Sequence, residues 1–154
     1  MKIWPLLLAV TCSALCAAPV CAEASGNALA ATVHCASVAG PGRVLCELSV
    51  HAVAGRLVWS DALVVRAPAF ARPLRSRVVA TLGTDPSTGA SAATAKLALV
   101  ASQPGQGQLD VLARGVVCRD PEPGAGQACH AVALAVSALV LVGAPPVPAP
   151  APPP

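Results

Sequence analysis

Two runs of alternating apolar and polar residues flank a turn cluster near the start of the chain. The runs span residues 32–38 and 44–53, and Gly40-Pro41-Gly42 lies between them. Such alternation is typical of half-buried strands, and glycine and proline favour a tight connection. We therefore predict a β-hairpin that brings Cys35 opposite Cys46.

The sorting of side chains in this hairpin specifies its register. With Cys35 opposite Cys46, the apolar residues Val33 and Leu48 face each other on one side. On the other side His34 meets Glu47, and the neighbouring positions are also polar. A slip of one residue would place Glu47 among the apolar side chains. The pattern and the turn thus predict the same pairing.

Further along the chain, five more segments read as strands, and turn-rich joints separate them. Short alternating segments with glycine and proline between them are typical of an all-β protein. Residues 90–101 are rich in alanine and also compatible with a helix, but their leucines alternate, so we predict a strand over residues 94–102. The segment 129–142 is apolar on both faces, which predicts a strand covered on both sides or one that meets a partner. The five segments are Arg56 to Arg66, Leu74 to Leu82, Thr94 to Ser102, Gln108 to Cys118 and Cys129 to Val142.

Residues 1–22 have the features of a secretory signal peptide. Lys2 supplies a positive charge, an apolar run follows, and Val20-Cys21-Ala22 places small residues at a cleavage site. Residues 23–143 have the size of one domain. Residues 144–154 are almost wholly Pro, Ala and Val, which predicts a disordered, extended tail. We therefore expect an exported protein, periplasmic or secreted, with no transmembrane helix in the mature chain.

Four of the seven cysteines lie outside the predicted signal peptide. An even number of cysteines in an exported chain predicts disulfides. The pairing is open between two solutions. In the local one, Cys35 joins Cys46 and Cys118 joins Cys129, each across a turn. In the other, Cys46 joins Cys118 and Cys35 joins Cys129. We favour the local solution.

The spacing of Cys46, Trp59 and Cys118 resembles the cysteine, tryptophan and cysteine pattern of immunoglobulin domains. The resemblance implies a disulfide between two sheets, from Cys46 to Cys118. The chain has no tyrosine, so it departs from the family at the tyrosine corner, where Val116 stands. Both disulfide solutions agree with one fold class. We predict an all-β fold, a small immunoglobulin-like β-sandwich of about seven antiparallel strands, stabilised by disulfides.

Aromatic side chains are scarce. Trp59 and Phe70 are the two aromatic residues outside the predicted signal peptide. Apolar neighbours place Trp59 in the core, which leaves few aromatic rings to form a usual glycan groove. Asp61 interrupts the apolar alternation after Trp59 and indicates a bulge or turn, where its side chain satisfies local backbone donors.

Charge is uneven in one place, residues 66–77, which carry four arginines and no acid. Guanidinium groups bind carboxylates and phosphates, so this segment predicts a contact surface for a protein or an anionic cell-envelope component. The alternative is a solvated edge that Pro and Arg protect from pairing. A formal net charge of only +3 for the whole chain argues against nucleic acid as a partner. The candidate contact residues are Arg66, Phe70, Arg72, Arg75 and Arg77.

The histidines are weaker candidates for a functional site. His34, Glu47 and His51 project from the polar face of the predicted hairpin, but His34 and His51 are offset along the strands, so we expect no metal site there. His34-Cys35 and Cys129-His130 form a mirrored pair of dipeptides. These dipeptides support an alternative function, a metal-binding or redox protein.

Motifs of catalysis are absent from the sequence. It contains no GxSxG, P-loop, HExxH or Gly-rich dinucleotide motif. We therefore expect neither an enzyme nor a cofactor. The abundance of Ala, Val, Pro, Gly and Arg is typical of a high-GC bacterial genome. Together these features predict a bacterial, non-catalytic binding or structural module with an unspecified ligand.

Overall fold

A computed structural model describes residues 28–119 and 126–143, and within these residues all regular elements are strands. Nine strands form two sheets whose ladders are antiparallel. The all-β prediction is confirmed. The strands are β1 (Leu29–Cys35), β2 (Gly42–Ala52), β3 (Arg56–Arg66), β4 (Ala71–Pro73), β5 (Arg77–Val79), β6 (Thr81–Thr84), β7 (Ser91–Ala101), β8 (Gly105–Cys118) and β9 (Cys129–Val142).

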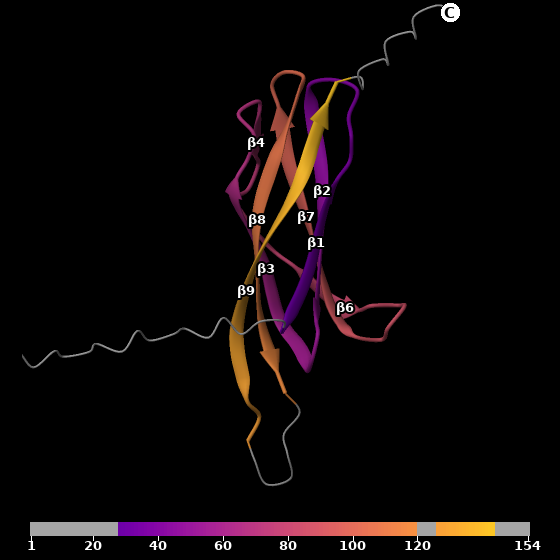
Figure 1. Ribbon diagram of the computed structural model, residues 1–154, viewed down its shortest axis with the longest axis vertical. Coiled ribbons are helices and arrows are strands. Elements are labelled where there is room, and N and C mark those ends of the chain that lie inside the picture. The colour runs from indigo at the N-terminus through magenta and orange to yellow at the C-terminus, as the bar shows by residue number, and fades with distance from the viewer. Residues whose placement is uncertain (1–27, 120–125, 144–154) are drawn as a thin grey trace, which may run out of the picture.

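The first sheet has the order β1-β2-β7-β4, with β6 also paired to β7, and the second has the order β5-β3-β8-β9. The long strands run together along the longest axis of the molecule, and β6 projects to one side (Figure 1). Val38 joins the two sheets: its N–H donates to Leu141 O at 3.2 Å, and its carbonyl accepts from Gly143 N–H at 2.9 Å. The edge strands β1 and β9 therefore lie close together.

The register of the first hairpin is confirmed. Cys35 pairs with Cys46, and His34 pairs with Glu47. Along β2 every second residue from Val44 onwards is buried, while the residues between them are exposed or half-buried. One face of this hairpin thus enters the core, as the alternation predicts.

Both disulfides are local. Cys35 bonds to Cys46 within the β1–β2 hairpin, and Cys118 bonds to Cys129 within the β8–β9 hairpin. In each case the two cysteines are directly opposed in the ladder. The disulfide between sheets that the immunoglobulin resemblance implied, from Cys46 to Cys118, is therefore not formed.

Side chains from both sheets form one hydrophobic core. Leu48 and Leu99 enter it from the first sheet, and Leu109 and Val117 enter it from the second. Burying one such side chain contributes about 1.5–3 kcal/mol. In β7 every second residue from Ala93 to Ala101 is buried, a period of two that a helix could not give. The prediction of a strand rather than a helix is therefore confirmed here.

The predicted strand 74–82 is replaced by two short strands, β5 and β6, and a third short strand, β4, precedes it. The chain pairs with β7 in β4, crosses to β3 in β5 and returns to β7 in β6. β4 ends at Pro73, which has no N–H to donate, and the Leu74 N–H donates a last hydrogen bond to Ala98 O of β7 at 2.9 Å. Between β5 and β6 the Ala80 N–H donates to Ser60 O at 3.0 Å. Alternation predicts extended backbone but not which sheet it joins, so the count is nine strands within the described residues rather than about seven.

β9 has the predicted bounds but differs in burial. Val140 and Val142 are buried, whereas Leu139 and the odd-numbered residues before it are exposed. β9 ends the order of the second sheet and has β8 as its ladder partner. The prediction of a strand covered on both sides is therefore wrong for most of its length.

Two predicted segments lie outside the described residues, the signal peptide of residues 1–22 and the tail of residues 144–154. The strands lie within the predicted domain, from Leu29 to Val142. In the part of the chain that the structure describes, no helix has the length and hydropathy to cross a membrane.

Candidate functional site

Four cationic side chains gather on the outer face of the first sheet. Arg72 on β4, Val100 on β7 and Arg43 on β2 form one row of paired residues. Lys96 lies further along β7, and Arg75 follows β4; with Arg43 these two line a shallow hollow. All four cationic residues are exposed. We call Arg43, Arg72, Arg75 and Lys96 the basic face.

The hollow within the basic face has an apolar component. Leu74, Val78 and Ala98 line it between the cations, and Leu74 is 55% exposed. Among residues 28–119 and 126–143, the ion pairs that form involve other arginines, Arg66, Arg77 and Arg114. The cations of the basic face are thus available to a partner that carries negative charge.

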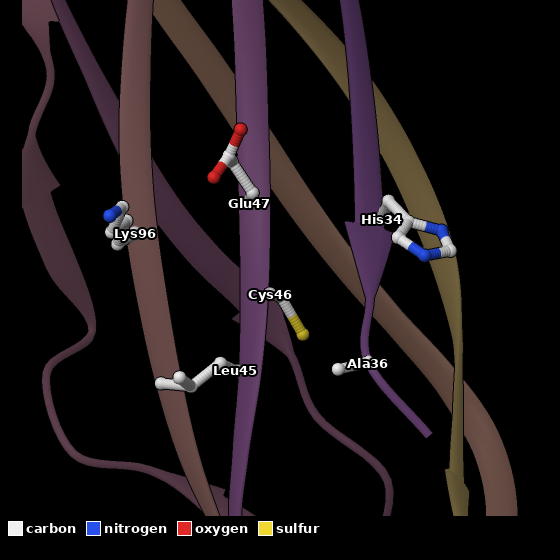
Figure 2. A pocket seen from close by; sticks show the side chains of 6 residues that line it. All are labelled: His34, Ala36, Leu45, Cys46, Glu47 and Lys96. Carbon is white, nitrogen blue, oxygen red and sulfur yellow. The ribbon is translucent and has the colours of Figure 1, made fainter.

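A second hollow adjoins this face and contains the predicted polar row. His34, Glu47 and Lys96 pair across β1, β2 and β7. Figure 2 shows Glu47 between Lys96 and His34, each on its own strand, with Leu45 and Ala36 nearby. The row presents an imidazole, a carboxylate and an ammonium group to solvent.

His51 does not join His34 and Glu47. It pairs with Ala30, four residues along β1 from His34, which is a separation of about 13 Å along a strand. The described residues contain no group of three His, Cys, Asp or Glu side chains that could hold a metal ion. The geometry therefore gives the metal hypothesis no support.

Arg66 and Phe70 contribute to the fold. Arg66 Nη2 lies 2.7 Å from Asp110 Oδ2, in an ion pair between β3 and β8. Phe70 is buried, and a Cβ added at Gly105 would lie 2.7 Å from its ring. Phe70 therefore packs on glycine backbone, where it presents little surface to a partner. The glycines that admit its ring are distant in sequence, so the segment 66–77 alone did not reveal this burial.

Arg77 belongs to a different cluster, on the outer face of the second sheet. Asp61 is 0% exposed and accepts hydrogen bonds from Arg77 Nε at 2.5 Å and from Arg114 Nε at 2.8 Å and Nη2 at 2.5 Å. Burial raises the pKa of Asp61, but the hydrogen bonds and charges of Arg114 and Arg77 outweigh it, and the pKa falls below its usual value. The donors to Asp61 are therefore arginines rather than the local backbone groups we predicted.

Trp59 lies beside this cluster instead of in the core. The β3–β8 register shifts between Leu57 and Trp59, which marks a bulge. Leu57 and Ser60 are buried, while Trp59 is half-buried on the other face. Arg77 Cζ lies 5.9 Å from the centroid of the Trp59 ring, within the range of a cation–π contact. The bulge reverses the alternation from which we placed Trp59 inside.

Comparison with known proteins gives little similarity. No protein-family model matches the chain, and a search of curated proteins gives no match. A solved chain from a study of fibronectin binding and biofilm formation by AAF fimbriae of enteroaggregative Escherichia coli is 9% identical. The match covers 73% of this chain and 99% of that chain, with a TM-score of 0.29. This TM-score is too low to infer a common fold.

Proposed function

We propose that this protein is an exported immunoglobulin-like β-sandwich that acts by binding, and that the basic face is its contact surface. The strand orders β1-β2-β7-β4 and β5-β3-β8-β9 support this fold. With β6, which also pairs with β7, in the position of D and β5 in that of C′, they correspond to the ABED and C′CFG orders of immunoglobulin domains, and β4 is an additional short edge strand. Two disulfides in the described residues support export to an oxidising compartment.

The arrangement of the basic face is the observation that carries the proposal. Arg43 and Arg72 flank Val100, so two strand spacings separate them, about 10 Å. An anionic group midway between them would lie about 5 Å from each, within the Debye length of about 8 Å at physiological salt, so both cations would attract it. Arg72, Arg75 and Arg43 also offer planar forks that match carboxylates and phosphates. A partner that presents several such groups fits this surface.

The alternative function, a metal or redox protein, is less well supported. Cys35 and Cys129 are both in disulfides, each with a neighbouring strand of its own sheet. A cysteine binds metal as a thiolate, which a disulfide does not provide. His34 and His130 thus stand beside sulfurs that are already bonded.

Charge reversal on the basic face tests the proposal. We expect the double variant R72E/R75E to bind anionic probes at least about tenfold more weakly than the wild type, because two attractive charges become repulsive. The probes are phosphatidylglycerol vesicles for phosphates and polyglutamate for carboxylates, each measured at low and at physiological salt. Added salt is expected to weaken binding by the wild type.

A matched control is available in Arg56, at the start of β3, and Arg119, which follows β8; both are exposed. R56E/R119E changes the net charge by the same amount in a different place and is expected to bind like the wild type. Equal loss of binding in R56E/R119E and R72E/R75E would show that the effect depends on net charge alone. Wild-type binding by R72E/R75E would contradict the proposed contact surface.

A further inference from the structure

We propose that a second site, the hollow beside Trp59 on the outer face of the second sheet, binds a sugar that carries an oxyanion. The hollow is lined by Trp59, Arg77, Arg114, Gly115, Ala131 and Ala133. It lies on the opposite sheet from the basic face. The site therefore goes beyond the proposed function and can fail or succeed separately from it.

Small side chains on β9 create the hollow. Ala131 pairs with Val116, and Ala133 pairs with Arg114, so both alanines lie beside the cluster on its outer face. Arg114 extends towards Asp61 on β3, away from Ala133. The space left between the Trp59 ring and the alanines is about 300 Å³, which is the lower end of the range for small-ligand sites.

The cluster carries an excess positive charge. Two guanidinium groups share the one carboxylate of Asp61. Each guanidinium has five N–H donors, and Arg77 gives Asp61 only its Nε, while Arg114 gives Nε and Nη2. The side chains of Arg77 and Arg114 are 56% and 35% exposed, so the remaining donors reach solvent. A ligand carboxylate or phosphate can accept hydrogen bonds from them.

Asp61 also fixes the two guanidinium groups before any ligand arrives. A surface arginine normally loses side-chain entropy when it binds an anion, and that loss weakens binding. Here hydrogen bonds to a buried carboxylate hold Arg114 by two nitrogens and Arg77 by one. The cation–π contact with Trp59 restrains Arg77 further. The donors are thus preorganised for an oxyanion.

The remaining surfaces of the hollow indicate what carries this oxyanion. The indole of Trp59 and the methyl groups of Ala131 and Ala133 form an apolar wall next to the charged donors. An aromatic ring beside polar groups is suited to a molecule with one apolar face and a polar rim, which describes a pyranose. The ligand class is therefore an acidic sugar, with a carboxylate or a phosphate on the ring.

Fluorescence of Trp59 tests this inference on the exported protein. Trp4 lies in the predicted signal peptide, so Trp59 is the one tryptophan expected after processing. The probes are glucuronate for the carboxylate, glucose 6-phosphate for the phosphate and glucose as the neutral control. We expect a saturable change in emission with at least one acidic probe and none with glucose. The acidic probe that binds more tightly identifies the oxyanion.

A variant that fills the hollow tests the proposed site most directly. Ala133 is exposed, so A133L is tolerated by the fold, and we expect it to weaken binding of the acidic probe at least about tenfold. A135L adds the same side chain one pair of residues further along β9, outside the hollow, and is expected to bind normally. R72E/R75E, on the other sheet, is also expected to bind normally. An equal response to glucose, no saturable response, or unchanged binding in A133L would overturn the site.

Discussion

Removing both disulfides is expected to lower the free energy of unfolding by about 6 kcal/mol. Each bond closes a short loop in the unfolded chain, and the chain-entropy model assigns about 3 kcal/mol to a loop of this length. A domain of this size has a total stability of about 5–15 kcal/mol. The reduced protein is therefore expected to lose between about two-fifths and all of its stability.

The two bonds are expected to differ when removed one at a time. Cys35 and Cys46 are both buried, so the double variant C35A/C46A loses packing as well as the cross-link. Cys118 is buried but Cys129 is exposed, so C118A/C129A loses the cross-link and less packing than C35A/C46A. Urea unfolding of both variants, with and without reductant, measures the difference. Equal midpoints for wild type and variants would show that the disulfides do not stabilise this fold.

Removing both arginines from Asp61 is expected to cost about 3–5 kcal/mol of folding stability. In R77M/R114M the carboxylate of Asp61, which is 0% exposed in the wild type, has neither a cation beside it nor a side-chain hydrogen-bond donor. Adding D61N to this double variant is expected to restore much of the loss, because the buried group is then neutral. R66M is the control, since the exposed ion pair of Arg66 contributes about 0–1 kcal/mol. Urea unfolding at neutral pH compares the four proteins.

Acid gives an independent readout of the same carboxylate. The pKa of Asp61 is lower in the folded state than in the unfolded state, so the ionised carboxylate stabilises the fold fully above its unfolded pKa of about 3.9. This stabilisation is lost as the pH falls through the folded pKa. The pKa values of Asp85 and Asp110 are lowered too, by hydrogen bonds, so the wild type loses stability below about pH 4 for several reasons. The difference between wild type and D61N isolates Asp61. A difference that stays constant between pH 5 and pH 2 would contradict its role.

Local patterns predicted the parts of the fold that depend on neighbouring strands. The turn at Gly40-Pro41-Gly42 and the alternation around it specified the Cys35 to Cys46 register, because one slip would bury Glu47. The bounds of β9 followed from its uninterrupted apolar run. In both cases the deciding information lies within about twenty residues of sequence.

Features that depend on distant residues could not be predicted in the same way. The basic face needs Arg43 and Lys96 beside Arg72 and Arg75, and the pairing of β7 with both β2 and β4 brings them together. Alternation says which face a residue takes but not which strand lies next to it. The cluster at Asp61 depends on a bulge and on Arg114 of β8. The interrupted alternation around Asp61 indicated the bulge, but nothing in that segment indicates that Arg114 lies beside it.

Export with both disulfides formed is the premise of the proposed binding function, and one measurement tests it most directly. The intact mass of the protein recovered from its cells is compared before and after reduction and alkylation, with peptide mapping under non-reducing conditions. We predict loss of residues 1–22, no alkylation before reduction, and linked peptides for Cys35 with Cys46 and for Cys118 with Cys129. A retained leader, free thiols or a bound metal would contradict the account.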